Sequence, residues 1–170
     1  MANKEIADRL RPVMNQEGAA NGATHTLRLT AADLADNTTA DQSCVVQVTV
    51  PGTTPSATAP LHVRLCEARI TRAFERVGTG GAPPTANKQI QVGDAGDADR
   101  HHGNITVLAD QSPPTRIAPE AYLKHKATSA YVIYITFAAS GSGKKWSDID
   151  TGILDLFFNI SGPTTAVAAA

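Results

Sequence analysis

Apolar and polar residues alternate with a period of two over most of the chain after residue 24. This alternation predicts half-buried β-strands, because successive side chains of a strand point to opposite faces of the sheet. The clearest runs carry on one face Leu27 and Leu29; Cys44, Val46, Val48 and Val50; Leu61, Val63 and Leu65; and Leu154, Leu156, Phe158 and Ile160. Shorter strands are expected at residues 89–92 and 104–108.

The segment 131–137 differs from the other runs because both of its faces are partly apolar. One face carries Tyr131, Ile133, Ile135 and Phe137, and the other carries Val132 and Tyr134. This pattern predicts a central strand that is covered on both sides.

After Leu65 the alternation changes parity, and two interpretations are open. A β-bulge adds one residue, which moves every later side chain to the other face. A helix over residues 65–77 is the alternative, because Cys66, Ile70, Phe74 and Val77 also lie at helical spacing. The β-branched Thr71 and the strand that precedes it favour the bulged strand.

Glycine and proline are concentrated between the predicted strands, at residues 51–60, 78–87, 112–114 and 140–143. Single helical turns are expected at residues 119–124 and at Ser147, which with Asp150 has the spacing of a capping box. Roughly eight strands without a long helix predict an all-β fold. We expect an antiparallel β-sandwich, jelly-roll-like in its connections.

The start of the chain does not share this alternation. Ile6 and Leu10 are four residues apart and Pro12 ends the pattern, which predicts a short helix at residues 3–11. Residues 15–22 are rich in Asn, Gly and Ala, so the beginning of the chain is expected to be an appendage. The expected organisation is an N-terminal arm at 1–22, a β-sandwich domain at 23–162 and a flexible C-terminal tail at 163–170.

Charge and composition exclude some classes of function. The chain has 15 Lys and Arg against 16 Asp and Glu, which argues against a nucleic-acid partner. It has no apolar stretch long enough for a membrane span and no secretory signal pattern. Cys44 and Cys66 lie in apolar runs, so buried free thiols and synthesis in a reducing cytoplasm are favoured over a single bridge.

The glycine-rich segment 141–146 (GSGKKW) matches part of the phosphate-binding loop motif. The motif requires glycine where Ala138 stands and Ser or Thr where Lys145 stands. The segment also lies between two predicted strands, so a hairpin loop is the better interpretation.

The acidic segment with Asp94, Asp97 and Asp99 is the best candidate for a metal site. Closely spaced carboxylates on a glycine-containing loop can bind Ca²⁺, but the calcium-loop template requires an oxygen donor at His101 and a glutamate near Leu108. The alternative is an Asx-turn, in which an Asp side chain accepts hydrogen bonds from nearby backbone N–H groups.

The remaining candidate residues give no catalytic or metal-binding pattern. His101 and His102 are adjacent and would point to opposite faces of a strand, whereas His25, His62 and His125 are scattered. No serine lies in G-x-S-x-G and neither cysteine has a catalytic signature. We therefore expect a protein that is not an enzyme and has no catalytic residues, metal or cofactor.

Aromatic residues form only 5% of the chain, and Trp146 is the single tryptophan. A sugar-binding β-sandwich usually presents aromatic platforms, so this class is a minor alternative, with Trp146 as the platform it would use.

Three stretches carry a resemblance to a known class of proteins. They are residues 24–50, which contain a DLADNTTADQ turn; residues 90–100, which contain a GDAGD loop; and residues 121–161, two long strands joined by a polar loop. Together they resemble small virion proteins of tailed bacteriophages, of the head decoration, cement or minor structural kind.

The resemblance implies a jelly-roll-like sandwich, often a homotrimer, that docks on the capsid exterior and bridges subunits of the major capsid protein. The protein would then be assembled in the host cytoplasm and reside in the virion. Ile6, Leu10 and Val13 form an apolar row in the arm, and we expect them to contact a neighbouring subunit or the coat. Tail, neck or fibre-attachment positions are the main alternative, followed by a sugar- or protein-binding module. The arm at 1–22 and the loop at 78–87 depart from the resemblance.

Overall fold

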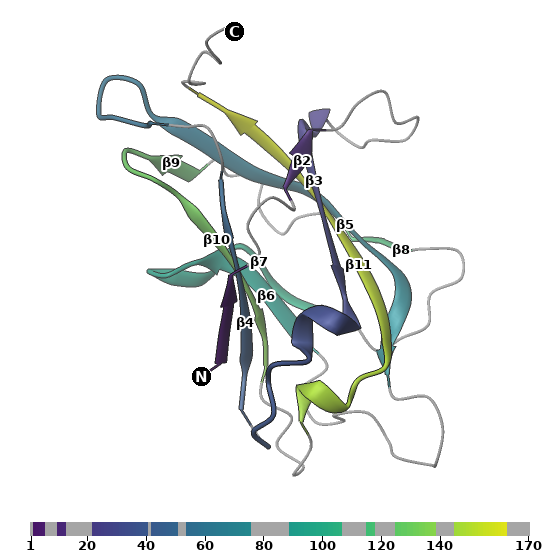
Figure 1. Cartoon of the computed structure of the whole chain (residues 1–170). Coiled ribbons are helices and arrows are strands. Elements are labelled where there is room, and N and C mark those ends of the chain that lie inside the picture. Colours follow the sequence, from purple (N-terminus) through teal and green to yellow (C-terminus); the bar gives the residue numbers. More distant parts are fainter. Residues whose placement is uncertain are drawn as a thin grey trace, which may run out of the picture.

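The computed structural model shows two β-sheets packed face to face (Figure 1). It describes residues 2–5, 10–12, 22–40, 42–50, 54–75, 89–106, 115–117, 125–138 and 145–162. The strands in these residues are β1 (Ala2–Glu5), β2 (Arg11–Pro12), β3 (His25–Thr30), β4 (Cys44–Thr49), β5 (Leu61–Glu75), β6 (Gln89–Asp94), β7 (Asp97–Thr106), β8 (Thr115–Ile117), β9 (His125–Ala127), β10 (Val132–Phe137) and β11 (Thr151–Ser161). Two 3₁₀ helices, η2 (Ala31–Leu34) and η3 (Trp146–Asp148), lie between strands.

One sheet has the strand order β1-β4-β10-β6-β7, and the other has the order β2-β3-β11-β5-β8, with β9 also pairing with β5. The described pairings are antiparallel except that of β1 with β4, which is parallel. The predicted all-β sandwich is therefore confirmed. None of the helices in the described part of the chain is long and apolar enough to cross a membrane.

The connections between the strands follow a jelly roll. If β1 and β2 are set aside and β8 and β9 are taken as one interrupted strand, the first strand pairs with the last, β3 with β11. The second then pairs with the seventh (β4 with β10), the third with the sixth (β5 with β8 and β9) and the fourth with the fifth (β6 with β7). This is the arrangement of a long hairpin rolled into two sheets, as in the double-sheet jelly rolls.

The parity change after Leu65 is a β-bulge. Phe158 of β11 lies opposite Leu65, but its neighbour Phe157 lies opposite Glu67, so Cys66 is the extra residue. Strand β5 then continues to Glu75, and the alternative helix over residues 65–77 is wrong for its described part. Pairing with β11 along nearly the whole of β5 satisfies its backbone in the extended form.

Strand β10 is central, as predicted, with β4 on one side and β6 on the other, but the predicted cover on both faces is wrong, because its second face is only half-buried. Its residues alternate between buried and half-buried positions, and Ile133, Ile135 and Phe137 enter the core. There the Phe137 ring packs against the rings of Phe74, at 5.5 Å between centroids, and Trp146, at 5.2 Å.

The N-terminal segment is built into the sandwich, which corrects the expectation of a helical appendage. Residues 2–5 pair with β4 and residues 11–12 with β3, and between them Leu10 is 5% exposed and belongs to the hydrophobic core. Without these pairings β4 and β3 would be edge strands with unpaired N–H and C=O groups, which attract an extended segment. Leu10 thus contacts its own domain, whereas Ile6 and Val13 lie outside the described residues.

The predicted helical turns have mixed outcomes. The turn at 119–124 and the tail at 163–170 lie outside the described residues. Near Ser147 the helix η3 begins after Lys145, without a side-chain cap, so the predicted capping box is wrong. A capping interaction occurs instead before η2, where the Asp33 carboxylate accepts a hydrogen bond from the Thr30 N–H at 2.8 Å.

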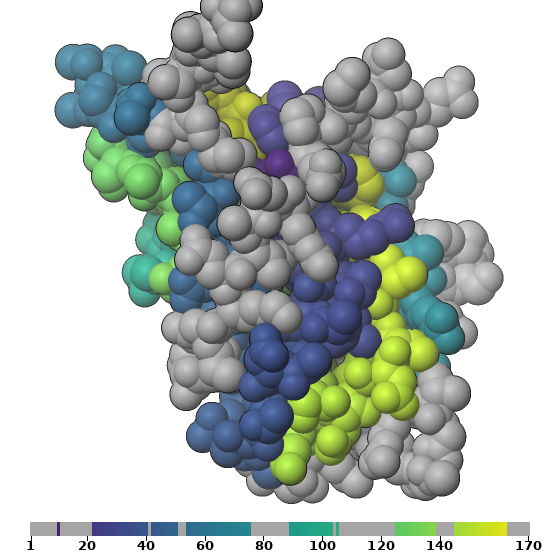
Figure 2. Space-filling model, in the orientation of Figure 1, coloured from purple at the N-terminus to yellow at the C-terminus, as the bar shows by residue number. Residues whose placement is uncertain are grey.

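The two 3₁₀ helices meet at one end of the sandwich. The Ser147 N–H donates a hydrogen bond to the Asn37 carbonyl at 3.0 Å, which joins the segment after β3 to the segment before β11. Figure 2 shows these segments, blue and yellow-green, side by side on the surface of this end.

Candidate functional site

The turn between β6 and β7 is organised by the Asp94 carboxylate. Its Oδ1 accepts hydrogen bonds from the backbone N–H groups of Gly96 at 2.8 Å and Asp97 at 3.0 Å. This is the Asx-turn predicted from the sequence. The register of β7 then shifts, since Asp94 lies opposite Asp97 but Val92 lies opposite His102. Strand β7 therefore has more residues than β6 between these two pairs, and Arg100 and His101 are among the extra ones.

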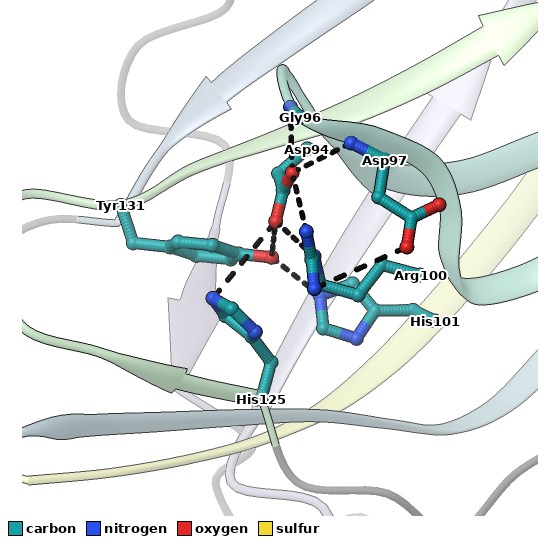
Figure 3. Close-up of polar contacts among 7 residues, drawn as sticks. All are labelled: Asp94, Gly96, Asp97, Arg100, His101, His125 and Tyr131. Carbon is teal, nitrogen blue, oxygen red and sulfur yellow. Dashed lines mark hydrogen bonds and ion pairs between the residues drawn. The ribbon is translucent and has the colours of Figure 1, made fainter.

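Seven residues around this turn form a connected polar group, which we call the Asp94 cluster (Figure 3). Its members are Asp94, Gly96, Asp97, Arg100, His101, His125 and Tyr131. The Arg100 guanidinium donates to both oxygens of Asp94, through Nε to Oδ2 and through Nη2 to Oδ1 at 3.4 Å. Its Nη1 also lies 3.9 Å from Asp97 Oδ2.

A chain of hydrogen bonds leads from the protein core to the Asp94 carboxylate. The Tyr131 hydroxyl donates to Asp94 Oδ2 at 3.1 Å, so it accepts from His101 Nε2, which lies 2.8 Å away. A neutral His101 must therefore carry its proton on Nε2. The His101 side chain is almost fully buried, and its ring contacts the ring of the core residue Phe158 edge-on.

His125 completes the cluster from strand β9. Its ring lies against the Tyr131 ring, with 5.0 Å between centroids, and 6.3 Å from the His101 ring. Its Nε2 is 3.9 Å from Asp94 Oδ2, close enough for an ion pair if the imidazole is protonated. Two parts of the chain that are distant in the sequence, residues 94–101 and 125–131, are thus joined at one carboxylate.

Burial sets the protonation states of the cluster. It lowers the pKa of His101 to about 4, with a further contribution from the neighbouring His125, and it also lowers the pKa of His125. It raises the pKa of Tyr131, as does the negative charge of Asp94. For Asp94, burial acts upward, but hydrogen bonds from Arg100, Gly96 and Tyr131 hold its pKa below the ordinary value. At neutral pH the cluster therefore has two neutral imidazoles, and the Arg100 guanidinium pairs with the carboxylates of Asp94 and Asp97.

This arrangement fits a structural role better than a catalytic or metal-binding one. Asp94 accepts five hydrogen bonds, and a carboxylate has about four lone-pair sites. It thus has no free oxygen for a calcium ion or a substrate proton, which argues against the calcium interpretation. Within the described residues, no group of three or more His, Cys, Asp and Glu is placed to hold a metal ion.

A surface groove runs beside the Asp94 cluster, and we call it the Tyr134 groove. It consists of two hollows, of about 400 and about 300 Å³, which share Tyr134 and the turn residues 94–96. The first hollow is lined also by Arg100, His125 and Lys126, and by residues 127–132. The second is lined by Val45, Thr136 and residues 97–98.

A second set of charged residues lies on the outer face of the other sheet. Arg28 makes a two-pronged ion pair with Asp155, through Nε at 2.7 Å and Nη2 at 2.9 Å. Arg69 pairs with Glu67, and its guanidinium carbon lies 4.6 Å from the centroid of the Phe157 ring. Arg28 and Arg69 each have a carboxylate partner, so these two pairs add no net charge to this face.

The structure places the other predicted candidates in the interior. Neither Cys44 nor Cys66 forms a disulfide, and both are buried, as the plain core interpretation predicted. Trp146 is 1% exposed and donates from Nε1 to the Ala138 carbonyl at 3.0 Å, so it does not offer a platform to a sugar. His101 and His102 are both buried. Of the GSGKKW segment, residues 141–144 lie outside the described residues.

Sequence reasoning identified Asp94 but missed Arg100, His125 and Tyr131 as its neighbours. The GDAGD turn was the one local signal, because Asx-turns are read from adjacent residues. His125 and Tyr131 lie more than twenty positions further along and arrive through the pairing of β9 with β5 and of β10 with β6.

The sequence was also compared with known proteins. It matches no protein-family model and no curated protein.

Proposed function

We propose that this chain is a non-enzymatic virion protein that decorates the capsid of a tailed bacteriophage and bridges subunits of its major capsid protein. The observation that carries the proposal is the jelly-roll pairing order, first strand with last and second with seventh. Double-sheet jelly rolls build many viral capsid domains, and also lectins and cupins. The choice among these classes rests on the resemblance of residues 24–50, 90–100 and 121–161 to small phage virion proteins.

Two features of the fold support an assembly role. The N-terminal segment pairs with both β4 and β3, which protects edges that would otherwise invite strand pairing with other chains. In the Asp94 cluster Arg100 pairs with the Asp94 carboxylate, and the contacts join β6, β7 and β9 to Tyr131, just before β10, so we expect this part of the sandwich to be rigid. A rigid subunit with protected edges suits a protein that must stay separate until it docks on a shell.

The test is the number of copies in purified virions, measured by quantitative mass spectrometry against the major capsid protein. Decoration predicts many copies, in a simple ratio to the coat, and heads that lose heat resistance when this protein is omitted. Few copies, or copies that purify with tails, would overturn the capsid assignment in favour of a tail, neck or fibre-attachment position.

The expected partner besides the coat is the chain itself, as a homotrimer. Size-exclusion chromatography with light scattering gives the mass of the purified protein directly. A trimer would match three-fold positions on a head. A monomer that also fails to sediment with empty heads would contradict decoration.

A further inference from the structure

Tyr134 has an unusual position among the aromatic residues of the described chain. It lies on β10 between Ile133 and Ile135, which enter the core, so its own side chain points to the opposite face of the sheet. It is half-buried there and lines both hollows of the Tyr134 groove. Its ring is therefore a wall of the groove and is open to a ligand, unlike the rings of Trp146 and Phe137.

The first hollow contains more hydrogen-bond donors than acceptors. Asp94 is the carboxylate of this lining, and its oxygens are already occupied by Arg100, Tyr131 and the turn backbone. Arg100 uses Nε and Nη2 for Asp94, and its Nη1 lies 3.9 Å from Asp97 Oδ2, beyond hydrogen-bond distance, so the N–H groups of Nη1 can still donate to a ligand. Lys126 adds three more donors from an exposed position.

The charge of the lining points in the same direction. Arg100 and Lys126 contribute two positive charges to the first hollow, against one negative charge from Asp94, whereas the Asp97 carboxylate lines the second hollow. Thr128 and Ser129, on the same wall, supply hydroxyl groups that donate or accept. The second hollow, with Val45 and Ala98, is the less polar end of the groove.

We propose that the Tyr134 groove binds an acidic sugar, with the sugar ring against Tyr134 and the carboxylate towards Lys126 and Arg100. The face of an aromatic ring is electron-rich, so it packs well against the C–H groups on the face of a pyranose. The spare donors require acceptors on the ligand, because donors that are covered without a partner weaken binding. A volume of about 400 Å³ lies within the range of small-molecule sites, about 300–1,000 Å³. This proposal is independent of the capsid assignment, since either could fail without the other.

The test uses two pairs of sugars that differ only in the carboxylate: galactose with galacturonate, and glucose with glucuronate. Each is titrated into the whole ¹⁵N-labelled protein while amide chemical shifts are followed, and sodium acetate serves as an anion without a ring. We expect at least one uronate to shift the amides of residues 94–96 and 126–134, more strongly than its neutral partner and than acetate.

Substitutions distinguish the contribution of the Tyr134 ring to binding from that of the Lys126 charge. Tyr134→Leu should weaken uronate binding by about tenfold or more, equivalent to about 1.4 kcal/mol, while Tyr134→Phe retains it. Lys126→Gln should reduce the preference for the uronate over the neutral sugar. Lys145→Gln, which removes an exposed charge outside the groove, is the matched control and should have no effect.

Three results would overturn the proposal. The first is that none of the four sugars shifts these amides. The second is that acetate binds as well as the uronates, which would show a plain anion site. The third is that Tyr134→Leu binds normally while its amide spectrum shows an intact fold, because then the ring has no part in recognition.

Discussion

At the scale of single residues, the Asp94 carboxylate joins polar groups that satisfy one another's hydrogen bonds. Tyr131 bridges His101 and Asp94, at 2.8 and 3.1 Å, so its hydroxyl fixes the tautomer of one neighbour and fills a lone pair of the other. Arg100 compensates the charge that burial would otherwise oppose. Loss of one member therefore affects several hydrogen bonds at once.

Replacement of Tyr131 by Phe tests this dependence. The variant keeps the ring but leaves His101 Nε2 without its acceptor and Asp94 with one donor fewer. We expect the free energy of unfolding to fall by about 1–3 kcal/mol, the typical penalty for a buried polar group that loses its partner. Urea unfolding measures the change. Tyr134→Phe is the matched control, because the Tyr134 hydroxyl bonds to no described residue, and an equal loss in both variants would contradict the role of Tyr131.

The same cluster predicts how stability depends on pH. The pKa of His101 is about 4 in the folded protein and near its ordinary 6.5 in the unfolded chain, so the unfolded chain binds more protons between these values. The contribution of the neutral imidazole is therefore complete above pH 6.5 and is lost as the pH falls towards 4. We expect a decrease of roughly 3 kcal/mol over this window, since each pKa unit corresponds to about 1.4 kcal/mol.

Urea unfolding at a series of pH values from neutral to about 4.5 measures this dependence. The variant His101→Gln does not titrate at this position, so its stability should fall less steeply over the same window. Parallel curves for the two proteins would assign the dependence to other groups. Asp94 acts only in more acidic solution, because its pKa lies below the ordinary carboxyl value and its contribution is lost as the pH falls through that pKa.

At the scale of the elements, the contact between β5 and β11 contains more than one irregularity. Besides the bulge at Cys66, the register shifts again near Gly152, where Thr151 lies opposite Glu75 and Ile153 opposite Arg72. Here the Phe74 ring lies directly over Gly152. A Cβ atom at this position would be 2.4 Å from Phe74 Cδ1, closer than side chains tolerate.

Gly152→Ala should therefore destabilise the protein. Phe74 is fully buried and packs on Phe137, so it has little freedom to move away. We expect a loss of about 1–3 kcal/mol, as for other overpacked cores, measured by thermal or urea unfolding. Gly96→Ala is the control, because a Cβ there meets nothing closer than 3.4 Å, and it should change stability by less than about 0.5 kcal/mol.

The hydrophobic pattern of the sequence predicted the individual strands well, but it did not predict the contacts between the N-terminal segment and the sandwich. The strand β5 was predictable with its bulge, because a period of two makes an added residue visible as a change of parity. The N-terminal segment was misread as a helix, since the spacing of Ile6 and Leu10 is a weak local signal. Pairing with the open edges of β4 and β3 makes this segment extended despite its helical spacing. These edges exist only once the sandwich is assembled, so the local sequence does not show them.

At the scale of the whole molecule, the N-terminal segment fastens the two sheets to each other. Strand β1 belongs to one sheet, β2 to the other, and Leu10 enters the core between them. Deletion of residues 1–12 would expose the edges of β4 and β3 together. We expect a protein that is less stable and associates with itself, detected by light scattering at increasing concentration.

Leu10→Ala is the companion variant, because it removes the core contact and retains the backbone pairing of both strands. It should lower the free energy of unfolding by about 2 kcal/mol or more without promoting association. Association of the point variant to the same degree as the deletion would show that core loss, rather than the open edges, drives it.

The pairing of β3 with β11 has a consequence for how the chain reaches its native state. Arg28 and Asp155 are ion-paired across these strands although they are 127 residues apart in the sequence. On a ribosome β3 emerges well before β11, its neighbour in the sheet, and cannot pair with it until the residues between them have been made. Folds dominated by such distant contacts form slowly, because the entropy of closing a long loop is lost before the contact is gained. The nascent chain thus carries unpaired strands while residues 31–150 are made, and chaperone supply during translation should limit the yield of soluble protein.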